Sequence, residues 1–165
     1  MDARMKRFVC WAAFLCPVLL AAQDDSARKL SKRYGYTHEP SLYSQKTPQE
    51  ALQSIIKALD AKKIDYLLAH LSDPKFVDDR VAEYKAFQKG SAEAKTVLAF
   101  ERLARETVLH FQEDPLLIKE LRQYVKDAEW EIQEATAVGT LKTASPRRVY
   151  LRKVEERWFL ENRQQ

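Results

Sequence analysis

The chain has 165 residues, a length typical of one domain, and 45% of them are apolar and 32% charged, which indicates a globular protein. Three glycines are too few for a Gly-rich phosphate loop, a collagen-like repeat or a turn-dense all-β fold. The net charge of +4 falls to +2 beyond residue 22, where 25 basic side chains stand against 23 acidic ones. Such a balanced charge excludes nucleic acid as an expected partner.

The N-terminus has the parts of a cleavable export signal. A basic stretch, residues 1–7, precedes residues 8–22, which carry no charge. A spanning helix needs about 20 apolar residues, and this run of 15 is also interrupted by Pro17. Small side chains end the run at Ala22, so we expect a signal peptide over residues 1–22. The expected location is exported, periplasmic or extracellular, with membrane attachment only if the signal stays uncleaved.

The rest of the chain is expected to form a linker and one domain. Both cysteines, Cys10 and Cys16, lie within the signal, so the mature protein would have no disulfide and no thiolate nucleophile. Residues 23–46 are polar and show no apolar periodicity, which predicts a linker or loosely packed arm. Residues 47–165 are long enough to bury a core of their own.

The expected domain begins with helices. Residues 47–50, Thr-Pro-Gln-Glu, combine an N-cap hydroxyl, a proline in the first turn and a glutamate three residues after the cap, so a helix is expected over about 48–62. A second, shorter helix ends at Ser72-Asp73-Pro74, because the residue before a proline is pushed away from the α region. Apolar residues at helical spacing predict further helices over 76–90, over 91–113 and after Pro115.

After Asp127 the apolar spacing changes from helical to alternating. One alternating run extends from Trp130 to Thr140, a second surrounds Val149, and a third ends at Leu160. Helices followed by strands predict an α+β fold, in which the N-terminal helices pack on a short antiparallel meander of about three strands.

Two stretches that bracket this domain resemble a known superfamily. Residues 47–72, TPQEALQSIIKALDAKKIDYLLAHLS, resemble the opening helix pair of the nuclear transport factor two-like superfamily, which includes ketosteroid-isomerase-like and polyketide-cyclase-like domains and many exported bacterial proteins. Residues 154–162, VEERWFLEN, are similar to its closing hairpin. The resemblance implies a cone-like fold with a pocket against a curved sheet. Members usually carry a strand between the second and third helices, where this sequence predicts helix.

Two histidines are candidates for acid–base catalysis. The superfamily includes isomerases, dehydratases, hydrolases and non-enzymatic binding domains, so function has to be argued from side chains. His70 lies three residues before Asp73, and His110 lies four residues from both Glu106 and Asp114. Either spacing would place a carboxylate beside an imidazole on one helical face. No metal-ligand spacing or cofactor fingerprint is present, so neither a metal nor a cofactor is expected.

The C-terminal hairpin is rich in basic residues. The candidates for contact with an acidic ligand, partner or headgroup are Arg147, Arg148, Arg152, Lys153 and Arg157. The alternative interpretation is that charged edge strands discourage aggregation.

These features favour an exported, non-catalytic binding or accessory domain for a small-molecule or protein ligand. The alternative is a small isomerase- or dehydratase-type enzyme that uses a His–carboxylate pair in a cone-shaped pocket. A third interpretation is a structural envelope protein that acts through its basic arm and hairpin. The sequence names no ligand, and it is compatible with a homodimer.

Overall fold

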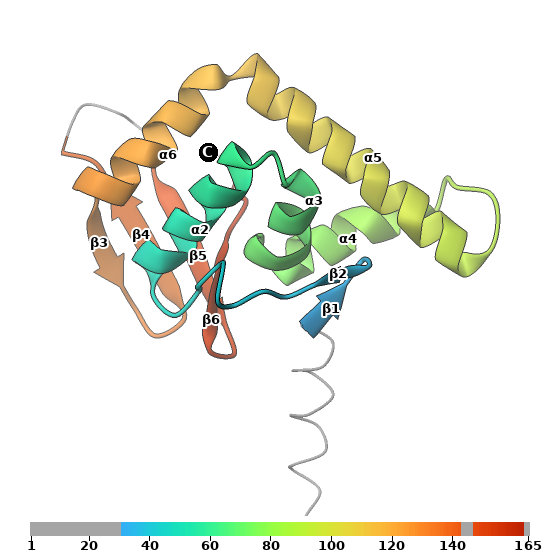
Figure 1. Ribbon diagram of the computed structural model, residues 1–165, viewed down its shortest axis with the longest axis horizontal. Coiled ribbons are helices and arrows are strands. Elements are labelled where there is room, and N and C mark those ends of the chain that lie inside the picture. The colour runs from blue at the N-terminus through green and yellow to red at the C-terminus, as the bar shows by residue number, and fades with distance from the viewer. Residues whose placement is uncertain (1–30, 143–146, 164–165) are drawn as a thin grey trace, which may run out of the picture.

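The structure, a computed structural model, describes residues 31–142 and 147–163. After a short two-stranded hairpin, helices precede a C-terminal antiparallel sheet, which confirms the predicted α+β class (Figure 1). The helices are α2 (Pro48–Asp60), α3 (Ile64–Tyr66) with its π-helical continuation η1 (Leu67–Leu71), α4 (Pro74–Lys85), α5 (Ala92–Glu113) and α6 (Pro115–Asp127). The strands are β1 (Lys32–Arg33), β2 (Tyr36–Thr37), β3 (Glu129–Ile132), β4 (Thr136–Thr140), β5 (Val149–Val154) and β6 (Arg157–Leu160).

The expected signal peptide, residues 1–22, lies outside the described residues, as does the first part of the expected linker. Within the ranges that the structure describes, no helix combines the length and the apolar character needed to cross a bilayer. The helices from α2 onward and the sheet that contains β3 all fall within the expected domain, 47–165.

Helix α2 begins where its capping sequence predicts. The backbone N–H of Glu50 donates to Thr47 Oγ1 at 3.2 Å, and Pro48 occupies the first turn. The carboxylate of Glu50 accepts a hydrogen bond from the Ser44 hydroxyl. One glutamate therefore fixes both the start of the helix and the chain that enters it.

The C-terminal sheet has four strands in the order β3–β4–β5–β6, all antiparallel, rather than about three. The alternating run from Trp130 to Thr140 is two strands, because the chain reverses between Gln133 and Thr136, whose backbone N–H and C=O groups bond each other. The sheet therefore contains one more hairpin than predicted, the one that joins β3 and β4.

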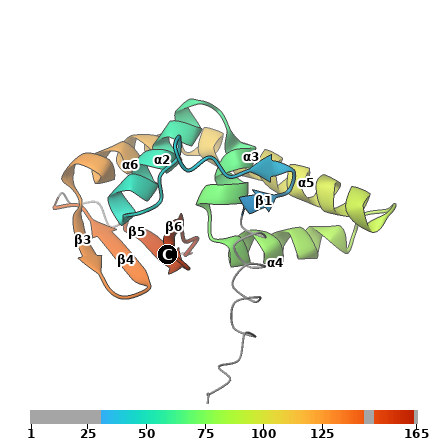
Figure 2. The ribbon, with the colours of Figure 1, turned by 60° about the horizontal axis from the view of Figure 1, so that its bottom comes forward.

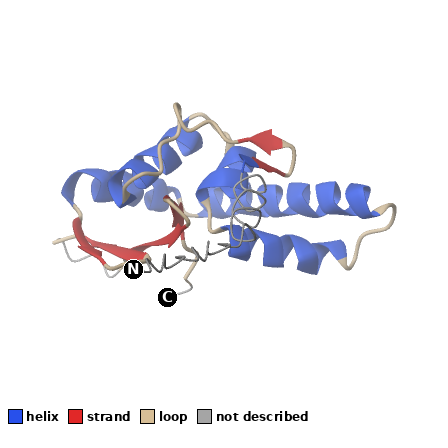
Figure 3. Ribbon diagram, turned by 90° about the horizontal axis from the view of Figure 1, so that it is seen from below, coloured by secondary structure: helices blue, strands red, loops and turns tan. Residues whose placement is uncertain are grey.

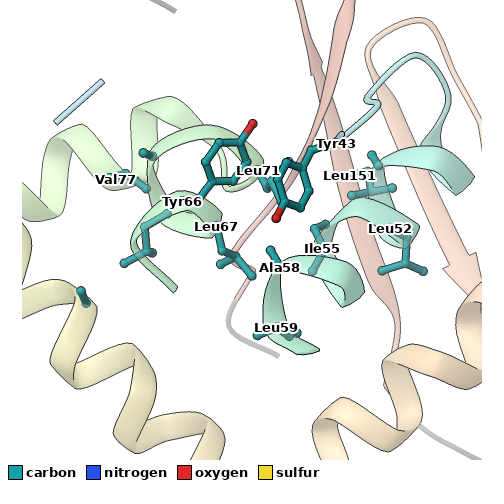
Figure 4. Close-up of a cluster of buried hydrophobic side chains, with 14 of the residues drawn as sticks. Tyr43, Leu52, Ile55, Ala58, Leu59, Tyr66, Leu67, Leu71, Val77 and Leu151 are labelled. Carbon is teal, nitrogen blue, oxygen red and sulfur yellow. The ribbon is translucent and has the colours of Figure 1, made fainter. Parts of the chain in front are cut away.

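Helices α2 and α6 lie over one face of the curved sheet (Figures 1 and 3). Helices α4 and α5 form an antiparallel pair that extends beyond the sheet to one side (Figures 2 and 3). The main core lies between α2, η1 and the inner face of the sheet, where Leu52, Ile55 and Leu151 are fully buried (Figure 4). Each such side chain contributes about 1.5–3 kcal/mol of burial free energy.

Residues 31–46, here named the strap, belong to the expected linker or arm, and two of their side chains, Tyr43 and Gln45, are buried in the domain. Strands β1 and β2 form a hairpin whose two turn residues, Tyr34 and Gly35, have φ of 51° and 91°. This is the geometry of a tight two-residue hairpin turn. Further along, Tyr43 is 2% exposed and its ring centroid lies 4.5 Å from that of Tyr66 (Figure 4). Buried aromatic area holds the segment in place despite its polar composition.

Candidate functional site

A cluster of polar side chains lies where the strap meets η1 and β6, with His70 fully buried and with His38 and Arg157 partly exposed. His38 and His70 have ring centroids 5.5 Å apart, and Tyr66 lies 5.0 Å from His70 by the same measure. Gln45 and Arg157 complete the group, since Gln45 is 3% exposed and Arg157 acts electrostatically on both histidines. We name these five side chains the imidazole cluster.

His70 is held in one tautomer by the strap. Its Nε2 lies 2.8 Å from the backbone oxygen of Tyr36, and since a carbonyl only accepts, Nε2 carries the proton and donates. Nδ1 is then an acceptor, and it is buried without a hydrogen-bond partner among the described residues. The side chain is 0% exposed. Burial lowers the pKa of His70, although the bond to Tyr36 acts in the opposite direction.

His38 is also neutral at pH 7. Burial, with smaller contributions from Arg157 and His70, lowers the pKa of His38 to about 4. Its Nε2 is buried and makes no hydrogen bond within the described part of the chain. The imidazole cluster therefore combines two neutral rings with one guanidinium.

Neighbouring groups define the electrostatics of the cluster. The Arg157 guanidinium lies 5.2 Å from the centre of the Phe159 ring, and burial lowers its pKa. The nearest acidic residue with an effect on His70 is Glu39, whose backbone N–H donates to the Tyr66 hydroxyl at 2.9 Å. The site favours uncharged imidazoles, because positive charge is already present and water is largely excluded.

The predicted pairing of His70 with Asp73 is wrong. Asp73 instead caps α4 by accepting from the backbone N–H of Lys75 at 3.0 Å, and its other oxygen lies 3.6 Å from Arg152 Nη1. Ser72, between the two helical segments, has extended backbone angles. A spacing of three residues therefore no longer places the two side chains on one face.

The predicted group of His110 with Glu106 and Asp114 is not formed either. Glu106 accepts from Arg102 Nε at 2.9 Å and from the Tyr84 hydroxyl, so it links α5 to α4. Asp114 caps α6, and it also forms an ion pair with a basic residue before β5. His110 itself is exposed on the last turn of α5. Both carboxylates are therefore bonded away from the imidazole.

Three of the predicted anion-contact residues take part in ion pairs. Arg147 binds Asp114 at 2.9 Å and Glu120 at 3.1 Å, where it ties the start of β5 to helix α6. Lys153 binds Glu156 at 3.1 Å across the β5–β6 turn. The third, Arg152, is held by the carboxylate that caps α4.

These basic residues do not form one surface. Arg152 and Lys153 are adjacent in β5, so their side chains leave opposite faces of the sheet. Arg157 belongs to the imidazole cluster, while Arg148 is exposed before β5. The surface that the sequence suggested is divided among several local contacts.

No set of three or more His, Cys, Asp or Glu side chains is placed to hold a metal ion within residues 31–142 and 147–163. The imidazole cluster also has a guanidinium beside its two rings, which disfavours a bound cation.

Comparisons with protein-family models, with curated proteins and with solved structures found no match to this chain. The resemblance to the nuclear transport factor two-like superfamily therefore stays a prediction. Where that superfamily usually has a strand, between the second and third helices, this chain has an isolated parallel bridge between Ser72 and Leu160.

Proposed function

We propose that the chain is an exported, non-catalytic domain that acts by binding a partner. The observation that carries the proposal is that Asp73, Glu106 and Asp114, the carboxylates expected beside the histidines, are all bonded elsewhere. A histidine base needs access to substrate and usually a group that orients the ring. His70 has no access because it is fully buried, and His110 has no carboxylate partner within the described part of the chain.

Export is supported by the basic start and uncharged run within residues 1–22. The predicted product begins at Gln23, and mass spectrometry of the protein recovered from cell fractions measures this directly. A chain that begins at Met1 and remains in the cytoplasm would contradict export. That result would not bear on whether the domain is catalytic.

Complementation tests whether the histidines do chemistry. In the source organism with the gene deleted, we expect His110→Gln and His70→Gln to restore the lost phenotype at neutral pH as well as the wild-type gene does. Leu52→Asp, which places a charge at a fully buried position, is the control for loss of folding. A histidine variant that folds normally but fails to complement would instead favour an isomerase- or dehydratase-type enzyme.

A further inference from the structure

The two ends of the strap are held by different contacts. The first part, residues 31–41, covers the imidazole cluster and is named here the latch hairpin. It is held by Arg33, whose Nη2 lies 2.6 Å from the Asp78 carboxylate, and by Tyr34, which stacks on the Phe100 ring at 4.3 Å. Two hydrogen bonds join it to the cluster: the carbonyl of Tyr36 accepts from His70, and the backbone N–H of Glu39 donates to the Tyr66 hydroxyl.

The second part of the strap is held by further contacts that do not involve the histidine rings. Tyr43 lies in the main core, 2% exposed. Gln45 bonds the edge of β6 twice, since its backbone oxygen accepts from Trp158 N at 3.0 Å and its Nε2 donates to Trp158 O at 2.7 Å. The latch hairpin can therefore move while residues 42–46 stay paired with the sheet.

Protonation would add positive charge where burial and the neighbouring guanidinium groups disfavour it. A second proton on His70 would lie on Nδ1, which is buried and has no acceptor among the described residues. From β6, Arg157 repels a charge on either ring, and from the strap Arg33 repels a charge on His70. Imidazolium ions buried beside guanidinium groups are costly.

The remaining neighbours offset this only in part. Glu39 of the strap favours a charge on His70, and Gln45 favours one on His38 by hydrogen bonding. Tyr66, on α3, is uncharged and already accepts from the backbone of Glu39. Burial remains the largest influence on both histidines.

We propose that the latch hairpin is an acid-released device, closed over His70 while His70 and the hairpin's own His38 are neutral, and open when both rings are protonated. Opening gives the two imidazolium groups access to water, and it removes the cover from the imidazole cluster. Helix α2, the sheet and residues 42–46 keep their places in the open form.

The direction of the pH dependence follows from linkage. A histidine whose pKa is lower in the closed form than the ordinary 6.5 stabilises that form fully above about pH 6.5 and loses this contribution as the pH falls. For His38, with a closed-form pKa of about 4, the ratio of closed to open hairpin falls about 10- to 70-fold between about pH 7.5 and about pH 4.5.

Hydrogen–deuterium exchange of the purified protein at these two pH values tests the proposal. After correction for the intrinsic exchange rate, the protection of amides in residues 31–41 should fall by that factor in acid, while amides of α2 and β5 remain protected. Unchanged protection of the latch hairpin would overturn the proposal. Equal loss of protection along the whole chain would overturn it too, because the protein would then be unfolding globally.

Variants assign the effect to the two rings. Glutamine at position 70 keeps an N–H donor for the carbonyl of Tyr36 but does not titrate. We expect His38→Gln and His70→Gln each to reduce the pH response of the latch hairpin, and the double variant to abolish it. His110→Gln, the same substitution at an exposed histidine outside the cluster, should keep the full response.

If the double variant does not fold, NMR titration of the wild-type rings decides, since the chain has only three histidines. Resonances of His38 and His70 should titrate together with the amide resonances of the latch hairpin, below pH 6.5. Ordinary titration of both rings without a change in those amides would contradict the proposal.

Discussion

Gly139 shows how one residue sets the packing of the sheet. It lies opposite Trp130 on the neighbouring strand β3. A Cβ atom at position 139 would be 3.2 Å from the Trp130 ring, closer than atoms normally pack. Glycine therefore allows the close approach of the indole here, and it does not serve an unusual backbone conformation.

Gly139→Ala should destabilise the protein by about 1 kcal/mol, because the well-packed indole must shift slightly to accommodate the methyl group. Urea unfolding measures the change in free energy. The same substitution made together with Trp130→Leu should cost less, since the smaller side chain leaves room. An equal cost in both backgrounds would show that the indole does not limit this position.

The histidines show what sequence predicts of a site and what it does not. His70 stands out in the sequence, but helical spacing pairs it with Asp73, a neighbour that the structure bonds to Lys75 and Arg152. Its actual neighbours, such as His38, come from chain segments that only the tertiary fold brings together. Sequence spacing reports contacts within one element, so a cluster built from three elements is not visible in it.

The strap contains buried side chains that its composition does not indicate. Its polar composition resembles that of a linker, yet two short-range features indicate structure. Tyr34-Gly35 suits a tight hairpin turn, because glycine adopts positive φ without strain. Tyr43, in contrast, has no periodic apolar neighbours, and its burial depends on the position of Tyr66 in α3.

Asp78→Ala should loosen the latch hairpin at neutral pH. The Asp78 carboxylate accepts two hydrogen bonds from Arg33 and, at 2.6 Å, one from the Tyr34 hydroxyl, so its removal deletes three charge-assisted hydrogen bonds. We expect the protection of residues 31–41 to fall roughly fivefold, as measured by hydrogen exchange.

Asp79→Ala is the matched control for that variant. This neighbouring carboxylate binds Lys75 on the same helix, at 2.5 Å and on the surface. Its removal should leave the latch hairpin unchanged, because surface ion pairs of this kind contribute little. Equal effects of the two variants would show that Asp78 acts on α4 rather than on the strap.

Local signals explain why most helices were predicted well and one hairpin was not. Thr47 starts α2 and Pro115 lies in the first turn of α6, as capping rules require. The turn between β3 and β4, by contrast, has the sequence Gln133-Glu134-Ala135. It contains no Gly, Pro, Asn or Asp, so the alternating pattern around it resembles one continuous strand.

Long-range contacts join the ends of the described chain. The strap pairs with β6 through Gln45, and β6 also bonds the segment before α4, where Asp73 N donates to Leu160 O at 2.8 Å. Both contacts fall on the side of β6 away from β5, and they supply partners for an edge that would otherwise be open. The order of helices and strands was predictable from periodicity, whereas this closure of the sheet edge depends on tertiary contacts.

The most direct test of the arrangement is the proximity of the two imidazole rings in solution. At neutral pH, nuclear Overhauser effects should connect ring protons of His38 with those of His70, whose centroids lie 5.5 Å apart. Cross-peaks between Tyr66 and His70 serve as the reference within the folded domain, at 5.0 Å. If the reference peaks are present and the His38–His70 peaks are absent, the strap does not close over the imidazole cluster.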